Sequence, residues 1–417
     1  MGELANAHWD SKLFQPLKIA NGKIELKHRV VHAPLTRNRG TPLSDSTPEK
    51  PNRVWVPNEH VVDYYSQRAT AGGLIISEGL PPSLEVIFSP PDNGNAMPGV
   101  PGLFRQEQAA GWKKVVDAVH AKGGYIYAQL WHSGRANIPQ LTGTPIVAPS
   151  SVPWDDPDEH FPYPPPHTTA QVKLADHPPI ALTQDHITRT IGDFCDAART
   201  AMDVGFDGVE LHGGNGYLPE QFLSSNANQR TDEYGGTPEK RCKFVIDLMD
   251  GLARTVGEDN LAIRLTPFGL FNQARGEQRV ETWTHLCREL KRRLPRLSYV
   301  SFVEPRYEQI FSEAEKQAFL DSWGLSRVDL SVFRGIWGDT PFFSAGGFDD
   351  GNSWGLLEAG RYDGLLYGRY FISNPDLVAR LREGLPLAPY DRSTFYGPFA
   401  DPVVGYTDYP AYRDGTT

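Results

Sequence analysis

The chain has 417 residues, which is enough for one large domain or two average ones. Its formal net charge of -10 argues against nucleic acid or an anionic membrane surface as the main partner. The three cysteines are far apart in the sequence, so we expect reduced thiols. The N-terminus has no secretory signal pattern, and no apolar run reaches the length of a membrane span. We therefore expect a cytoplasmic protein without a membrane partner.

Eight short apolar segments predict β-strands that are buried on both faces, as in a parallel sheet. In chain order they are 29–33, 74–78, 125–129, 208–212, 261–265, 299–303, 341–345 and 364–367. Helical patterns lie between or after them at 59–71, 106–122, 186–204, 241–256, 283–294, 327–337, 351–359 and 375–383. This alternation predicts an α/β fold, a (β/α)8 TIM barrel. A doubly wound sheet is the alternative, but the first strand ends in Pro34-Leu-Thr-Arg37 and not in a glycine-rich dinucleotide turn.

The longest connection, 140–183, follows the third strand and is crowded with prolines. Proline interrupts helices and suits a central strand poorly, so we expect neither element there. We predict that 1–417 forms a single barrel domain in which 140–183 is an insertion that caps the mouth. The alternative is that 140–183 is a disordered surface insertion. A second long connection, 81–102, follows the second strand on the same face.

Polar side chains and glycines collect where the predicted strands end, and in a barrel these ends face a common mouth. They are Thr36, Gly79, Gln129, Trp131, His212, Asn215, Tyr217, Arg264, Glu304 and Arg306. This set contains no cluster of metal ligands, no nucleophile elbow and no lysine for a Schiff base. We therefore expect a hydrogen-bonding site without a metal.

The strand at 208–212 opens into a glycine-rich turn that carries three proton donors or acceptors, His212, Asn215 and Tyr217. A buried strand that ends in such a turn indicates a reactive pocket. The alternative to a reactive pocket is a buried histidine whose ring nitrogens are hydrogen-bonded within the protein, next to a tight turn.

Glycines follow the last two strands, at Gly346-Gly347 and at Gly368, and Arg369 comes next. In this fold the loops after strands seven and eight bind phosphate through backbone N–H groups, and an arginine adds a cationic fork. Glycines needed only for tight turns are the alternative. One compact phosphate site without a dinucleotide fingerprint indicates a mononucleotide or a sugar phosphate. FMN would also use Gln129 and Arg264 at its pyrimidine end.

Seven motifs in this order resemble the Old Yellow Enzyme flavoproteins, over roughly 13–412 of the chain. They lie at 33–37 (APLTR), 64–69 (YYSQRA), 129–132 (QLWH), 212–218 (HGGNGYL), 229–236 (QRTDEYGG), 303–306 (VEPR) and 367–377 (YGRYFISNPDL). The resemblance implies a (β/α)8 barrel that holds FMN non-covalently and takes electrons from NADPH or NADH. It also implies reduction of the C=C bond of a small α,β-unsaturated carbonyl compound, with hydride passing through flavin N5 in a ping-pong cycle.

The resemblance also implies roles for individual residues. Those that contact FMN would be Pro34, Thr36, Gly79, Gln129, Arg264, Gly346, Gly347, Gly368 and Arg369. His212 and Asn215 would bind the carbonyl oxygen of the substrate, and Tyr217 would donate the proton. Trp131, Phe271 and Tyr396 would shape the substrate pocket.

The chain departs from the family pattern in two ways. Gly213-Gly214 predicts a looser turn than a Ser-Ala pair, and the insertions at 43–57 and 140–183 predict a substrate larger than a simple cyclic enone. Two other functions stay open: a flavin-dependent isomerase or tailoring enzyme of secondary metabolism, and a barrel that binds flavin or phosphate without catalysis. A monomer and a homodimer are both compatible with the sequence.

Overall fold

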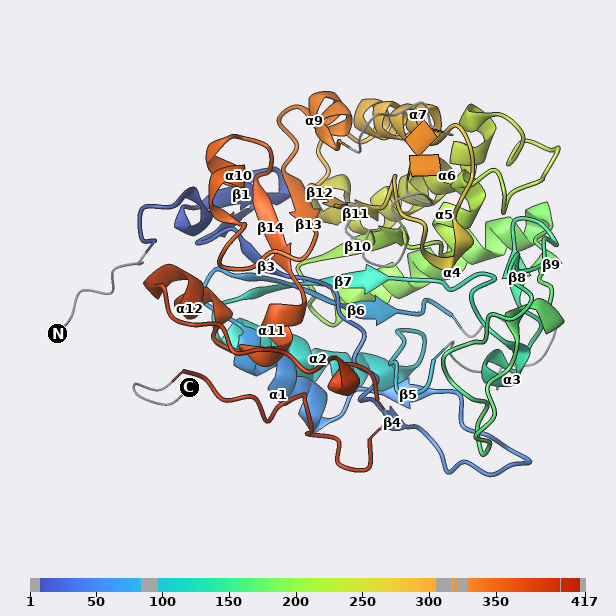
Figure 1. The fold of residues 1–417 in the computed structure, drawn as a ribbon, viewed down its shortest axis with the longest axis horizontal. Helices are drawn as coiled ribbons and strands as arrows, with labels where there is room; N and C mark the ends of the chain where they lie inside the picture. The colour runs from blue at the N-terminus through green and yellow to red at the C-terminus, as the bar shows by residue number, and fades with distance from the viewer. Residues whose placement is uncertain are drawn as a thin grey trace.

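Eight parallel strands close into a barrel in the computed structural model (Figure 1). The structure describes residues 8–83, 97–304, 317–318, 320–321, 329–397 and 399–412. The strands are β3 (Val30–His32), β6 (Leu74–Leu80), β7 (Tyr125–Leu130), β10 (Gly208–Gly213), β11 (Leu261–Leu265), β12 (Tyr299–Val303), β13 (Phe342–Ala345) and β14 (Gly364–Tyr367). They pair in chain order, and β14 closes the ring on β3. All eight predicted strands and the (β/α)8 fold are thus confirmed, and the doubly wound alternative is wrong because the sheet has no open edge.

The strands are apolar throughout because they are buried on both faces. Successive side chains alternate between an inner and an outer hydrophobic cluster, as the period of two in a strand requires. Leu74 and Ile76 join the inner cluster, whereas Ile75 joins the outer one. A hairpin of β1 (Leu17–Ile19) and β2 (Ile24–Leu26) adds its own apolar side chains to the inner cluster.

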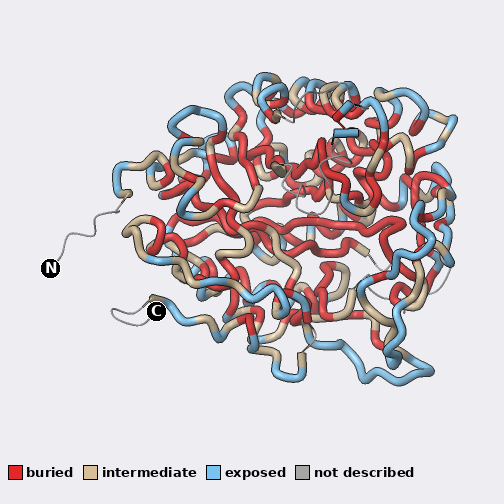
Figure 2. The backbone as a smooth tube through the Cα atoms, in the orientation of Figure 1, coloured by how far each residue is buried: buried red, intermediate tan, exposed pale blue. Residues whose placement is uncertain are grey.

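Helices surround the barrel and cover the outer cluster (Figures 1 and 2). They are α1 (Glu59–Arg68), α2 (Gln106–Ala121), α4 (Gln184–Asp203), α6 (Pro238–Val256), α7 (Arg279–Arg293), α9 (Ser331–Trp337), α10 (Trp354–Glu358) and α12 (Leu377–Glu383). Each corresponds to a predicted helix, with shifted ends; the expected start of the sixth, at 327, lies outside the described residues. N-cap threonines explain where α4 and α6 begin. The Thr183 side chain accepts a hydrogen bond from the His186 N–H, and the Thr237 side chain accepts one from the Lys240 N–H.

The insertion at 140–183 contains regular structure, contrary to our expectation. It begins within α3 (Pro139–Thr142), a single turn in which proline occupies the start, where its missing N–H costs nothing. A short parallel ladder joins β8 (Val147–Ala148) to β9 (Ile180–Ala181), beside the barrel at the right of Figure 1. The segment also packs around a small hydrophobic cluster of Ala136, Ile138, Leu141, Trp154, Phe161 and Leu174. This packing is not that of a disordered surface insertion.

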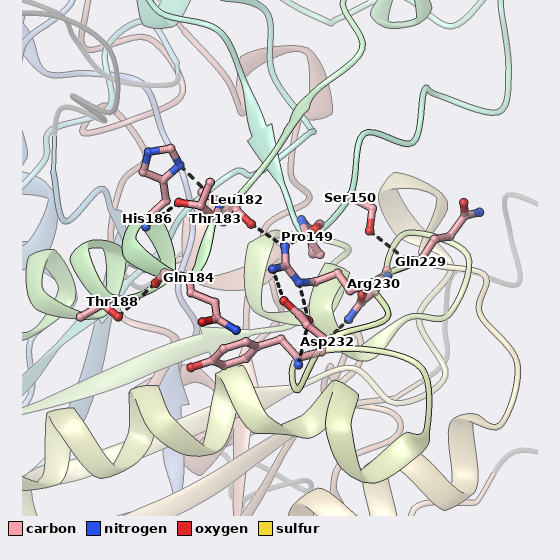
Figure 3. Close-up of polar contacts among 12 residues, drawn as sticks. Pro149, Ser150, Leu182, Thr183, Gln184, His186, Thr188, Gln229, Arg230 and Asp232 are labelled. Carbon is pink, nitrogen blue, oxygen red and sulfur yellow. Dashed lines mark hydrogen bonds and ion pairs between the residues drawn. The ribbon is translucent and has the colours of Figure 1, made fainter.

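Arg230 ties the two ends of this insertion together (Figure 3). Its Nη1 donates to the carbonyl oxygen of Pro149, at 2.8 Å, and to that of Leu182. Asp232 holds the guanidinium in place through bonds of 3.0 and 2.5 Å. Since Pro149 follows β8 and Leu182 follows β9, the 229–236 motif anchors the insertion to the barrel.

Two other long connections follow the strands β3 and β6. The 43–57 insertion is bounded by a hairpin of β4 (Thr41–Pro42) and β5 (Trp55–Val56). Residues 84–96 of the second connection lie outside the described part. Within the described ranges, none of the helices has the length and apolar character that crossing a bilayer requires.

Candidate active site

A cavity of about 740 Å³ opens at the carboxyl ends of the barrel strands. Twelve of the fifteen predicted site residues line it: Pro34, Thr36, Gly79, Gln129, Trp131, His212, Asn215, Tyr217, Arg264, Phe271, Arg369 and Tyr396. The sequence therefore identified about half of the 25 residues that line this cavity. Arg306, noted at a strand end, lies outside the described residues.

The three remaining residues, all glycines, are not part of the cavity wall, but they lie beside it. Gly346 and Gly347 follow β13, and Gly368 follows the neighbouring strand β14. Gly347 has a φ of +72°, and a Cβ at Gly346 would lie 2.4 Å from the Glu304 side chain. Both positions therefore require glycine for steric reasons. Arg369, which lines the cavity, begins the short helix α11 (Arg369–Ser373).

The two predicted halves of the site face each other across the barrel mouth. His212 lies on β10, and Gly368 and Arg369 directly follow β14. In the closed ring of eight strands, β10 and β14 are four strands apart, which places them on opposite sides. His212 and Arg369 nevertheless line the same cavity.

His212 is a neutral imidazole at physiological pH. Its burial, at 5% exposure, lowers its pKa to about 3, and the positive charge of Arg264 acts in the same direction. Among the described residues its Nδ1 has no hydrogen-bond partner. A buried polar atom of this kind is suited to a ligand.

Tyr217 keeps its phenolic proton over the same pH range. Burial raises its pKa to about 12, while a hydrogen bond with Asn272 opposes the shift. Its ring contacts Trp131 and His212 edge to face, with centroids 5.0 and 5.5 Å apart. Tyr217 is therefore a protonated donor held next to His212. Asn272, which also lines the cavity, was not identified from the sequence.

Glu210 is another residue that the sequence analysis missed. It is fully buried on β10, two residues before His212 and on the same face of the strand. Its Oε1 accepts a 2.7 Å bond from Gln129 Nε2. The Gln129 amide nitrogen thus points at Glu210, so its oxygen is directed away and is suited to accept a bond from a ligand. Glu210 could have been identified from the sequence, because it is the one carboxylate within an otherwise apolar strand.

Arg264 provides the positive charge of this wall. Burial lowers its pKa, and Glu210 opposes that shift. Its Nε and Nη1 are buried and have no partner among the described residues. Two such donors beside the oriented Gln129 amide fit the polar pyrimidine edge of FMN, and Arg369 with the strand-end glycines fits its phosphate. The residues present therefore fit this cofactor.

The turn after β10 is not loose, so our interpretation of Gly213-Gly214 was wrong. A Cβ at Gly214 would lie 2.7 Å from the Thr266 side chain, and one at Gly213 would lie 3.0 Å from the Arg264 carbonyl oxygen. These glycines allow β10 to approach the end of β11 closely.

The 140–183 insertion borders the cavity. Phe161, Tyr163 and Leu174 of the 140–183 segment line it, and none of them was identified from the sequence. Phe271 and Tyr396 are 53% and 57% exposed, so these two predicted pocket residues lie at the rim. Within the described ranges, His, Cys, Asp and Glu side chains form no group of three or more that could hold a metal.

Comparison with known proteins identifies the family. A model of the NADH:flavin oxidoreductase / NADH oxidase family matches residues 12–388. The flavin oxidoreductase hxnT of Emericella nidulans is 41% identical over 406 residues, which cover 95% of this chain and 97% of that protein. The 12-oxophytodienoate reductase 1 of Oryza sativa subsp. japonica is 38% identical over 400 residues, which cover 95% of this chain and 92% of that protein.

Solved structures agree with this assignment. Morphinone reductase in complex with tetrahydroNAD superposes with a TM-score of 0.77 at 35% identity, covering 97% of this chain and 99% of that chain. The Old Yellow Enzyme homologue from Zymomonas mobilis gives a TM-score of 0.78 at 31% identity, with 96% and 99% covered. The chain therefore belongs to the NADH:flavin oxidoreductase / NADH oxidase family and is a flavoprotein of Old Yellow Enzyme type.

Proposed function

We propose that the cavity binds both FMN and an α,β-unsaturated carbonyl compound in this NAD(P)H-dependent ene-reductase. Pro34, Thr36 and Gly79 would contact the flavin ring, and Gln129 and Arg264 its pyrimidine edge. The phosphate would lie at Gly346, Gly347, Gly368 and Arg369. The observation that carries the proposal is the neutral His212 beside the protonated Tyr217, facing Arg369 across one cavity.

These residues would act on the substrate as follows. Bound FMN supplies the hydride, which it receives from NADPH or NADH. His212 and Asn215 donate hydrogen bonds to the carbonyl oxygen and stabilise its growing negative charge, as an oxyanion hole does. Removing one such donor typically costs about 3–4 kcal/mol. Tyr217 then gives its proton to the α-carbon and recovers one from solvent.

The rate at which an enone reoxidises the reduced enzyme should not vary with pH between about 5 and 9. His212 stays neutral because its pKa is about 3, and Tyr217 stays protonated because its pKa is about 12. Neither group titrates in that window. Stopped-flow absorbance of the flavin would measure the rate, and an inflection near 6.5, the usual histidine pKa, would show that His212 changes charge during the reaction.

Anaerobic titration tests the proposed function directly. The purified protein should be yellow, should be bleached by NADPH and should regain its colour when an enone is added. Products formed from deuterated NADPH should be saturated and should carry deuterium on the carbon β to the carbonyl group. An isomerised product without net reduction would point instead to the isomerase alternative, and a colourless protein that FMN does not stabilise would indicate a barrel without catalysis.

An enone panel in the same titration tests the size of the substrate. Because apolar side chains of 140–183 extend the cavity wall, we propose a substrate larger than a simple cyclic enone. Cyclohexenone reacting faster than every bulky enone would contradict this.

We also propose that 1–417 is one domain with 140–183 as its cap, that the enzyme is cytoplasmic, and that it is a monomer or homodimer without nucleic-acid partners.

A further inference from the structure

The turn that carries Asn215 has an unusual backbone. Asn215 and Gly216 both lie in the left-handed region, with φ angles of 56° and 68°. A non-glycine residue in this region is uncommon and is retained where the surrounding structure holds it. Gly216 cannot be replaced without strain, because a Cβ there would lie 2.2 Å from the Phe271 carbonyl oxygen.

Side chains bind the backbone N–H groups of this pair. The N–H of Asn215 donates to Thr266 Oγ1 at 2.8 Å, and the N–H of Gly216 donates to Glu220 Oε2 at 2.7 Å. Thr266 then donates its own hydroxyl proton to the same Glu220 oxygen, at 2.7 Å. One carboxylate oxygen therefore fixes both residues, one directly and one through the threonine hydroxyl.

The backbone carbonyl groups of the pair are held as well. Asn272 Nδ2 donates to the carbonyl oxygen of Asn215 at 2.9 Å, and Gln221 Nε2 donates to that of Gly216 at 2.8 Å. All four polar backbone groups of the turn are thus bonded to side chains, which is enough to determine its conformation.

Arg279 anchors the carboxylate from behind. Its Nη2 lies 3.0 Å from Glu220 Oε1, and both side chains are 0% exposed. Its other donors bind the carbonyl oxygens of Pro267, Ala274 and Gly269 in the loop after β11. The pair therefore joins the turn after β10 to the loop after β11.

We propose that Thr266, Glu220 and Arg279 form a positioning unit that holds the Asn215 amide against the carbonyl oxygen of the substrate. None of the three lines the cavity, so they act through Asn215 and are not catalytic residues. This inference rests on the proposed role of Asn215. A donor misplaced by about 1 Å can cost on the order of 10²-fold in rate, so the unit matters for turnover as well as for folding.

The test is the variant Thr266→Val, which keeps the side-chain shape and removes the hydroxyl. Binding of cyclohexanone to the oxidised holoenzyme, followed through the flavin spectrum, should weaken at least about tenfold, and the rate of enone reduction should fall about 10²-fold. Reoxidation of dithionite-reduced enzyme by oxygen should stay within about twofold of wild type, because oxygen needs no carbonyl donor. Thr266→Ser, which restores the hydroxyl, should recover ketone binding and enone reduction.

Thr255→Val is the matched control. Thr255 also donates its hydroxyl to a backbone carbonyl, that of Gly251 at 2.9 Å, but it lies on α6 and outside the cavity wall. Ketone binding in Thr266→Val equal to that of this control would overturn the inference, as would equal losses with enone and oxygen. If no enone reoxidised the wild type, the proposed function would fail, while ketone binding would still decide whether the unit positions Asn215.

Discussion

Replacing Tyr217 by phenylalanine should slow the reoxidation of the reduced enzyme by an enone by about 10²–10⁴-fold, the usual contribution of a general acid. The ring would keep its edge-to-face contacts with Trp131 and His212, so the pocket should retain its shape. Only the protonated hydroxyl would be lost. Reoxidation by oxygen requires no proton at a substrate carbon and should remain close to the wild-type rate.

Stopped-flow measurement of both reoxidation reactions in the same preparation gives the decisive comparison. Tyr234→Phe is a suitable control, since this tyrosine is also buried and also donates a hydrogen bond, to Asp247 at 3.1 Å, but does not line the cavity. If Tyr217→Phe slowed both reactions to the same extent, Tyr217 would not be the proton donor.

The barrel could be predicted from the sequence because its determinants are local. A strand buried on both faces must be apolar along its whole length, and this property is visible in a window of five residues. The part of the cavity wall that the strand ends form could be predicted for a related reason, since the fold places every carboxyl strand end at one mouth. His212, Gln129 and Arg264 were found in this way, and all three line the cavity.

The interactions that position these residues could not be predicted, because they join segments far apart in the chain. Glu210 meets Gln129 across 81 positions, and Glu220 meets Arg279 across 59. Neither contact leaves a periodic pattern. The one-turn helix α3 was missed because we took the many prolines of this segment to exclude helices. Proline is nevertheless tolerated at a helix start, which is its position in α3.

The buried pair of Glu220 and Arg279 leads to the largest expected change in stability. In Arg279→Met the Glu220 carboxylate would lose its charged partner while remaining inaccessible to solvent. Breaking a buried ion pair from one side typically costs about 3–5 kcal/mol. Chemical denaturation of the FMN-loaded protein should therefore show a clearly lower midpoint. Arg292→Met is the control, because Arg292 is 63% exposed in its pair with Glu289 and an exposed ion pair contributes little to stability.

The pH dependence of this loss identifies its cause. Burial already raises the pKa of Glu220, and Arg279 is the main influence that opposes the shift. Without Arg279, the pKa of Glu220 in the folded state rises further above its pKa in the unfolded state. The free energy of unfolding therefore falls as the pH rises above the unfolded-state pKa of Glu220. The deficit of Arg279→Met should therefore be smaller at pH 5 than at pH 8. Adding Glu220→Gln should recover part of the stability at pH 8, and a double variant no more stable than Arg279→Met would show that the unpaired charge is not the cause.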